Sequence, residues 1–292
     1  MFAGTFTALV TPFQNDRIDE AAFERLVESQ IEAGISGIVP VGTTGESPTL
    51  DHAEHARVIE LGVKFARKRV PVIAGTGSNS TAEARHMTQK AEELGADAVL
   101  LVAPYYNKPS QEGLYQHFRA IAQSTRLPIM LYSIPGRCGI EIGVETVVRL
   151  AHDFSNVVAI KEAGGSVERV SQLRSVTPEK FQILSGDDSL TLPFIAVGGV
   201  GVVSVASNLI PRQVGDMVRA ALKGDFERAR QLHFQYYPLF KDLFIEPNPV
   251  PIKTALALNG LMTPEVRLPL CDMAEATRKK LEATLHGLNL VK

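Results

Sequence analysis

The stretch Val157-Val158-Ala159-Ile160-Lys161-Glu162 is an apolar run that ends on a lysine, and Ala163-Gly164-Gly165 follows it directly. A run of β-branched and aliphatic residues is typical of a parallel strand buried on both faces. A lysine at the end of such a strand loses hydration, which lowers its pKa from about 10.4 toward neutrality. The neutral amine is a nucleophile that can form a Schiff base with a ketone. Two plainer roles also fit: Lys161 extends its charged end to solvent, or it pairs with Glu162.

Segments with the apolar spacing of strands and of helices alternate on both sides of this stretch. Eight runs are predicted as strands: residues 5–10, 37–41, 70–74, 97–103, 128–132, 157–161, 181–184 and 200–205. Asp19 predicts the start of the first helix, and the pairs Asp51/Glu54 and Ser80/Glu83 predict capping boxes at the next two. Because parallel strands need crossover helices, eight such units predict an α/β fold, the (β/α)8 TIM barrel. A doubly wound open sheet fits less well, since no glycine-rich phosphate motif follows the first strand.

The chain is longer than such a barrel requires. Its 292 residues exceed the roughly 250 residues of a typical TIM barrel. We therefore expect a catalytic barrel over residues 1–224 and a C-terminal helical extension, residues 225–292, packed on it. Helices are predicted around 252–258 and 273–285, after the proline-rich break at 247–251.

The composition argues against several classes of partner. The net charge is −2, with both signs mixed along the chain, so neither a nucleic acid nor a membrane is expected as a partner. No apolar run approaches the roughly 18 residues of a membrane span, and the first residues lack the basic segment of a signal peptide. Cys138 and Cys271 form neither a disulfide framework nor a zinc motif. Together these features predict a reduced, cytoplasmic protein.

Polar residues follow the predicted strands, and catalytic groups of TIM barrels lie at these C-terminal strand ends. The set holds one amine, several hydroxyls, one guanidinium and little carboxylate: Thr43, Thr44, Tyr105, Tyr106, Tyr132, Arg137, Lys161, Gly186, Asp187, Val203 and Ser204. A metal hydrolase would need His, Asp and Glu there, so no metal site is predicted. An amine among hydroxyls favours carbonyl chemistry, in which an imine forms and phenol and threonine hydroxyls transfer protons.

Several longer motifs support the same chemistry. They are Gly42-Thr43-Thr44-Gly45-Glu46, the pair Tyr132 and Arg137, Lys161, and the runs 104–109 (PYYNKP), 184–188 (LSGDD) and 246–249 (EPNP). In this order they resemble the class I pyruvate-dependent aldolase (N-acetylneuraminate lyase) superfamily, and within it most closely the dihydrodipicolinate synthases. The resemblance extends from Phe2 to the C-terminal helices.

The resemblance implies a Schiff-base lyase that condenses pyruvate with L-aspartate-4-semialdehyde to 4-hydroxy-tetrahydrodipicolinate, in lysine (diaminopimelate) biosynthesis. Lys161 would form the imine with pyruvate, so no cofactor is implied. Tyr132 would be the general acid and base, and Thr43 would link it to the phenol of Tyr106, contributed by a neighbouring subunit. The family implies a homotetramer built from two tight dimers.

The resemblance also implies how the substrates are held. Thr43 and Thr44 would bind the pyruvate carboxylate, and Arg137 would bind the carboxylate of the aldehyde through its planar guanidinium. Gly186 and Val203 would line the site with backbone carbonyl groups.

Each of these positions has a plainer alternative. Tyr132 can be a core tyrosine bonded to the backbone, and Thr43 and Thr44 can form turns or caps. Tyr105 and Tyr106 can serve only to pack an interface, and Arg137 can pair with Glu141. Asp187 and Asp188 are interpreted as caps of the next helix and not as catalytic groups. Because all these groups follow strands of one barrel, the catalytic interpretation is favoured.

A second, regulatory site for L-lysine is implied. Its residues are those at which feedback-sensitive family members bind this ligand: Ser47, His52, His55, Asn79, Glu83 and Tyr105. The alternative is structural, with Glu83 completing a capping box and both histidines exposed on a helix.

The sequence departs from the pattern of the family at two positions near the proposed sites. Pro48 stands where some sensitive enzymes carry a small non-proline residue, and Ser133, beside Tyr132, stands where most members carry asparagine.

Two other functions remain open. A related pyruvate aldolase would act on a sugar acid such as N-acetylneuraminate or 2-keto-3-deoxygluconate, but Arg137 suits a short carboxylated aldehyde better than a polyol. A barrel that only binds a keto acid or lysine and regulates would not need Lys161, Tyr132 and Thr43 together.

Overall fold

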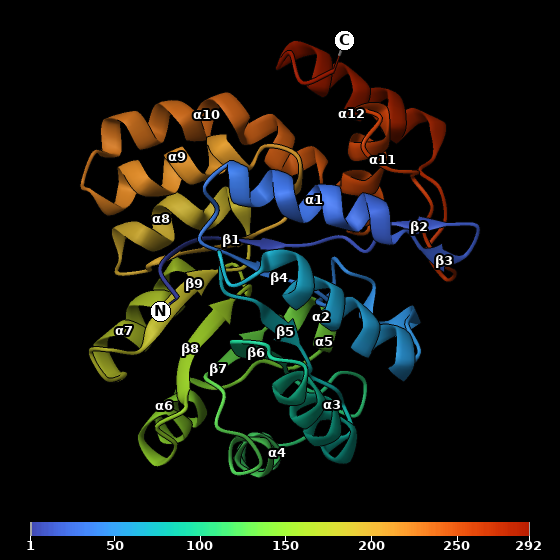
Figure 1. Ribbon diagram of the computed structural model, residues 1–292. Coiled ribbons are helices and arrows are strands. Elements are labelled where there is room, and N and C mark those ends of the chain that lie inside the picture. The colour runs from blue at the N-terminus through green and yellow to red at the C-terminus, as the bar shows by residue number, and fades with distance from the viewer. Residues whose placement is uncertain (1, 292) are drawn as a thin grey trace.

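The computed structural model describes residues 2–291. Parallel strands form one sheet in the order β4-β1-β10-β9-β8-β7-β6-β5, and a parallel bridge joins Ile38 of β4 to Val72, just before β5. The sheet is thereby wrapped into a nearly closed barrel (Figure 1). Its strands are β1 (Gly4–Ala8), β4 (Gly37–Val39), β5 (Ile73–Gly75), β6 (Ala98–Val102), β7 (Ile129–Ser133), β8 (Val157–Glu162), β9 (Gln182–Ser185) and β10 (Gly201–Ser204). The predicted TIM barrel is confirmed.

Helices alternate with these strands and cover the outside of the barrel (Figure 1). They are α1 (Glu20–Glu32), α2 (His52–Ala66), α3 (Thr81–Glu93), α4 (Gln111–Ala122), α5 (Pro135–Cys138), α6 (Val144–Asp153), α7 (Val167–Val176), α8 (Thr191–Ala196) and α9 (Pro211–Leu222), with 3-10 helices η1 (Ser47–Thr49), η2 (Asp188–Leu190) and η3 (Ala206–Asn208). Asp19 caps α1, and Asp51 with Glu54 forms the predicted capping box at α2. Ser80 caps α3. The second capping box is wrong, because the Glu83 side chain binds Ser78 and His52 instead.

Alternate residues of the strands belong to two separate apolar layers. The smaller one fills the barrel and consists of Phe2, Phe6, Ala8, Val39, Ile73, Ala98, Leu100, Met130, Tyr132, Ala159, Leu184 and Val203. Their strand neighbours, such as Ile160 and Leu131, belong to the larger layer between barrel and helices. Because side chains alternate with a period of two, Lys161 follows Ala159 on the inner side. The alternation therefore places its amine inside the barrel, at the C-terminal end of β8.

Three helices follow the barrel: α10 (Phe226–Asp242), α11 (Val250–Leu258) and α12 (Glu275–Gly287). The predicted C-terminal helices are thus present, with small shifts at their ends. α10 packs against α9, and α12 contacts both α10 and α11. The division of the chain at residue 224 stays a prediction, since α10 continues the packing of the last barrel helix.

One hairpin was not predicted. Strands β2 (Phe13–Gln14) and β3 (Arg17–Ile18) pair antiparallel around Asn15 and Asp16, whose φ angles are 54° and 59°. Asn and Asp tolerate this left-handed conformation, which a tight two-residue hairpin turn requires. Strands of two residues are too short to show an alternating pattern, so the Asn-Asp pair was the only signal.

Candidate active site

Lys161 is buried at the end of β8, with 5% of its surface exposed. The strand register places it directly beside Tyr132 of β7 and Leu184 of β9, and its Nζ atom lies 4.1 Å from the centroid of the Tyr132 ring. Burial lowers the pKa of Lys161 from 10.5 to about 7; the carboxylate of Asp188 opposes this shift, and the guanidinium of Arg137 adds to it. Much of the amine is therefore neutral near pH 7, as a nucleophile requires.

The alternative pairing of Lys161 with Glu162 is wrong, because neighbouring residues of a strand face opposite sides. The buried Glu162 carboxylate accepts hydrogen bonds from Arg169 Nε (2.8 Å) and from the backbone N–H of Gly164 (2.7 Å). Arg169 also forms an ion pair with Glu141 (3.1 Å). The alternative pair of Arg137 with Glu141 is likewise wrong: Arg137 Nη2 donates to the backbone carbonyl of Asn248 (3.1 Å).

Tyr132 is a buried phenol whose polar partner is a side chain. Burial raises the pKa of Tyr132 to about 12, and the positive charge of Arg137 and a hydrogen bond with Thr43 oppose this rise. The phenol therefore keeps its proton at neutral pH, in contact with a second hydroxyl that can pass a proton on. Neighbouring Ser133 is buried and accepts a hydrogen bond from the backbone N–H of Ile142 (3.4 Å), so its hydroxyl orders the chain after α5.

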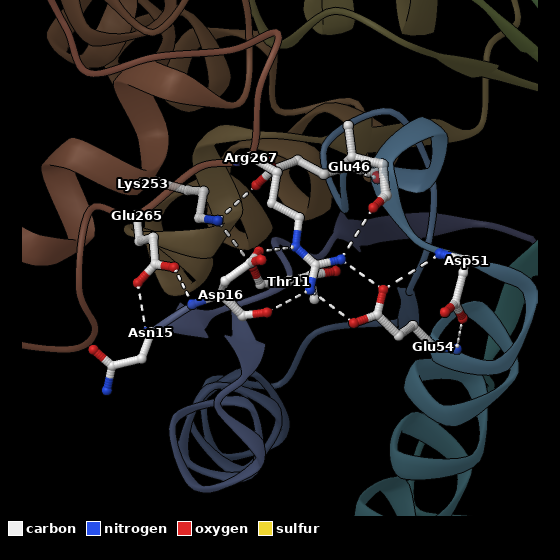
Figure 2. Close-up of polar contacts among 10 residues, drawn as sticks. Thr11, Asn15, Asp16, Glu46, Asp51, Glu54, Lys253, Glu265 and Arg267 are labelled. Atoms are coloured by element: carbon white, nitrogen blue, oxygen red, sulfur yellow. Dashed lines mark hydrogen bonds and ion pairs between the residues drawn. The ribbon is translucent and has the colours of Figure 1, made fainter.

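The loop 42–46, which carries both threonines, is held by residues of the C-terminal extension. Glu46 ends this loop in a left-handed conformation (φ 55°, ψ 36°). Its fully buried carboxylate accepts hydrogen bonds from Lys253 Nζ (2.6 Å) and from the backbone N–H of Arg267 (3.1 Å). Lys253 Nζ also donates to the backbone carbonyl of Thr11 (2.9 Å). Figure 2 shows Lys253 and Arg267 converging on this loop.

The guanidinium of Arg267 extends the same network to the surface. It donates to both carboxylate oxygens of Glu54 (2.6 and 2.7 Å) and to Asp16 Oδ1 (2.9 Å), as Figure 2 shows. Glu265 accepts from the backbone N–H groups of Asn15 (2.9 Å) and Asp16 (2.6 Å) at the turn of the hairpin. The extension thus fixes the hairpin, the start of α2 and the loop 42–46 relative to one another.

Gly186 leaves the space that the Lys161 side chain occupies. A Cβ atom at this position would lie 3.1 Å from Lys161 Cε and 2.6 Å from the Cβ of Ala163. Any side chain here would therefore displace the lysine or the backbone. Val203, the other predicted lining residue of this group, is buried in the barrel interior.

The two aspartates after β9 have different roles. Asp187 caps η2 by accepting from the backbone N–H of Ser189 (2.7 Å), as predicted. Asp188 was wrongly interpreted as a cap of the same helix: it is buried and accepts from Ser204 Oγ (2.5 Å) and from the backbone N–H groups of Val205 and Ala206 (3.0 Å each). Burial raises the pKa of Asp188 to about 6. Its electrostatic effect on Lys161 was missed, since the Gly-Asp-Asp run does not distinguish the two residues.

A cavity of about 950 Å³ opens beside Thr43 and Arg137. Its lining continues to most of the predicted regulatory residues, namely Ser47, His52, His55, Glu83 and Tyr105, and includes Pro48. Tyr132 and Lys161 are not part of this lining. Tyr132 is linked to it by its hydrogen bond with Thr43, which is a lining residue. Asn79 is also absent from the lining, and its Nδ2 donates to the backbone carbonyl of Tyr105 (3.1 Å).

Glu83 is the centre of a polar cluster in this cavity. Its two carboxylate oxygens contact Ser78 Oγ (2.6 Å) and His52 Nε2 (2.7 Å), and these contacts lower the pKa of Glu83. His52 is exposed, but the alternative that His55 is exposed is wrong. His55 is buried, with its Nε2 atom 2.7 Å from the backbone carbonyl of Gly75, and burial lowers the pKa of His55.

Tyr106 does not join the site of its own chain. Its side chain is 90% exposed, and its backbone is left-handed with φ 73°. The neighbouring Tyr105 is only 37% exposed and lines the cavity. Of the four predicted catalytic residues, the single chain brings together Lys161, Tyr132 and Thr43.

Within residues 2–291 there is no group of three or more His, Cys, Asp and Glu side chains arranged to hold a metal ion. No helix in the same range has the length and apolar character needed to cross a membrane.

Comparisons with known proteins agree over the full length of the chain. The model of the dihydrodipicolinate synthetase family matches residues 1–288. A curated 4-hydroxy-tetrahydrodipicolinate synthase from Sulfurihydrogenibium sp. (strain YO3AOP1) is 54% identical over 100% of both chains. The solved structure of the 4-hydroxy-tetrahydrodipicolinate synthase from Methylacidiphilum fumariolicum SolV is 59% identical with a TM-score of 0.98, over 99% of this chain and 96% of that one. A structure of DHDPS from Cyanidioschyzon merolae with lysine bound is 42% identical with a TM-score of 0.97, over 99% of each chain. The chain therefore belongs to the dihydrodipicolinate synthetase family.

Proposed function

We propose that this chain catalyses the reaction for which its relatives are named, the 4-hydroxy-tetrahydrodipicolinate synthase reaction. This lyase activity condenses pyruvate with L-aspartate-4-semialdehyde in lysine (diaminopimelate) biosynthesis, a cytoplasmic role. The observation that carries the proposal is the buried amine of Lys161, whose pKa is lowered to about 7, beside the ring of Tyr132. Full-length relatives at about half identity bear the synthase name, which favours this reaction over the sugar-acid alternative.

The first steps would use the three groups that the single chain brings together. Lys161 Nζ attacks the C2 carbonyl of pyruvate, and the carbinolamine loses water to give the imine. Tyr132 donates the proton that the departing hydroxyl needs and takes one back from C3 as the enamine forms, with Thr43 relaying protons. The enamine carbon then attacks the aldehyde. The amine of the second substrate displaces Lys161 as the ring closes, which returns the free enzyme.

Two carboxylates must be held during these steps. Thr43 and Thr44 would donate hydrogen bonds to the pyruvate carboxylate, and backbone carbonyls of Gly186 and Val203 would border the site. Arg137 lines the cavity, where its planar guanidinium suits the carboxylate of the aldehyde.

We also propose that the active unit is at least a dimer. A tyrosine that is 90% exposed and held in a left-handed backbone conformation is suited to enter a neighbouring subunit. Tyr106 would complete the relay through Thr43 of that subunit, and two such dimers would form the homotetramer. Activity that falls on dilution, in parallel with dissociation measured by sedimentation, would support this arrangement.

L-lysine is the proposed inhibitor, bound in the part of the cavity around Glu83. Support comes from a carboxylate that can accept its ammonium group and from the lysine-bound relative. Ser47, His52, His55, Asn79 and Tyr105 would surround the ligand, and Pro48 would stiffen its entrance.

The deciding experiment is a turnover assay with both substrates, run with and without L-lysine. We expect product from pyruvate and aspartate-4-semialdehyde and little from pyruvate with sugar-type aldehydes. A chain that accepts the sugar-type aldehydes better would belong to the alternative activity. A silent binder would turn over neither pair.

A further inference from the structure

Asn248 contacts residues assigned to both substrates. It lies between α10 and α11 and is 5% exposed. Its Nδ2 atom donates to Thr44 Oγ1 (3.0 Å), and its backbone carbonyl accepts from Arg137 Nη2 (3.1 Å). Its Oδ1 atom is buried and has no hydrogen-bond partner among the described residues. The side chain and the backbone of one residue thus serve two different groups.

We propose that Asn248 is a positioning residue for pyruvate, which fixes the Thr44 hydroxyl as a hydrogen-bond donor toward the substrate carboxylate. This inference rests on the proposed function. A hydroxyl has a single hydrogen to donate. Because the amide of Asn248 already donates to Thr44 Oγ1, that oxygen acts as acceptor there, and its hydrogen is left for another partner. The carboxylate of pyruvate can only accept hydrogen bonds. The Thr44 hydroxyl, which accepts from Asn248, therefore has its hydrogen free to donate to that carboxylate.

The surrounding structure holds the Asn248 amide next to the Thr44 hydroxyl. Pro247 and Pro249 flank Asn248 and restrict the backbone on both sides. Five residues further along the chain, Lys253 binds Glu46, which lies in the same loop as Thr44. The extension and the loop are therefore joined at two places, by the Asn248–Thr44 hydrogen bond and by the buried Lys253–Glu46 ion pair.

Asn248→Asp is the sharpest test, because it keeps the shape and replaces the donor by an acceptor. Thr44 would then turn its hydrogen toward Asp, and the new carboxylate would repel that of pyruvate. We expect the KM for pyruvate to rise at least tenfold, and the borohydride-trapped adduct on Lys161 to fall in parallel at subsaturating pyruvate. The KM for the aldehyde should change less than twofold, since the hydrogen bond from Arg137 goes to the backbone carbonyl of residue 248, which the substitution keeps.

Four further variants separate positioning from folding. Asn248→Ala removes the donor without adding charge, so its pyruvate KM should lie between those of the wild type and Asn248→Asp. In Thr44→Val the amide has no hydroxyl to orient, so adding Asn248→Ala should leave its pyruvate KM unchanged. The control is Asn259→Asp, an asparagine of the same extension whose Nδ2 donates to the carbonyl of Ala255 (2.9 Å). It should leave both KM values unchanged.

A purely structural role predicts a different pattern. Both KM values would rise together, and the effects of Asn248→Ala and Thr44→Val would add. That pattern, or a pyruvate KM within twofold of the wild type in Asn248→Asp, would overturn the inference. If Asn248→Asp fails to fold, the KM split in Asn248→Ala decides the question. A wild-type chain that turns over neither substrate would instead overturn the proposed function.

Discussion

The Nζ atom of Lys161 lies 4.1 Å from the centre of the Tyr132 ring, and the two residues are direct partners in the register of β7 and β8. Two neighbouring strands therefore bring the proposed nucleophile and the proposed proton donor to the same place. Burial lowers the pKa of Lys161 to about 7 and raises that of Tyr132 to about 12, so a substantial fraction of the amine is neutral at pH 7 while the phenol stays protonated. Imine chemistry needs both of these states at once.

Imine formation should increase with pH around neutrality. The neutral fraction of Lys161 rises as the pH increases through its pKa of about 7. The initial rate of borohydride-trapped pyruvate adduct should therefore rise with a midpoint near that pH and then level off. In Asp188→Asn the carboxylate that opposes the shift is gone, so the midpoint should move to lower pH. A midpoint above about 9 in the wild type would mean an ordinary charged lysine.

Arg137→Ala should separate the two substrates. It removes the guanidinium proposed for the aldehyde carboxylate but leaves Lys161, Tyr132 and Thr43 in place. We expect kcat/KM for the aldehyde to fall at least a hundredfold, in line with a loss of about 3 kcal/mol for a charged hydrogen-bonded contact. The pyruvate adduct on Lys161 should still form, as mass spectrometry after borohydride treatment would show. Unchanged turnover would contradict the role given to Arg137.

Gly186→Ala tests the space beside the nucleophile. The added Cβ would sit 2.6 Å from Ala163 Cβ and 3.1 Å from Lys161 Cε, so the backbone or the lysine must shift. We expect the rate of adduct formation to fall at least tenfold. Gly287→Ala, at the end of α12, is the control, because its Cβ would meet no atom within 4 Å. Equal rates in the two variants would show that the close approach to Lys161 does not matter.

Lys253→Met should destabilise the fold through Glu46. Both members of the pair have fully buried side chains, and an unpaired buried charge costs about 3–5 kcal/mol. Adding Glu46→Gln should recover part of this loss. Lys279→Met removes one partner of an exposed pair in the same extension, so its effect should stay below about 1 kcal/mol. Urea unfolding at fixed protein concentration would measure all three, and similar losses at Lys253 and Lys279 would be inconsistent with the buried pair.

The barrel, and the position of most of the proposed catalytic groups at one of its ends, could be predicted from the sequence because they depend on local patterns. Apolar runs of period two and spacing of 3.6 residues define strands and helices, and a parallel barrel brings the residues after its strands to one end. Lys161, Tyr132 and Thr43 lie where this rule puts them. The burial of His55, the role of Asp188 and the contacts of Asn248 with Thr44 and Arg137 depend instead on segments that are distant in the chain. Glu46 and Lys253, for example, are 207 residues apart in the chain, and no local pattern links them.

Trapping the pyruvate imine tests the central claim most directly. The wild-type protein would be treated with pyruvate and borohydride, digested, and mapped by mass spectrometry. We predict one reduced pyruvyl adduct, on Lys161 and absent from Lys161→Ala, with Lys253, which is also buried, unmodified as an internal control. An unmodified Lys161, or an adduct spread over exposed lysines that persists in Lys161→Ala, would contradict the account.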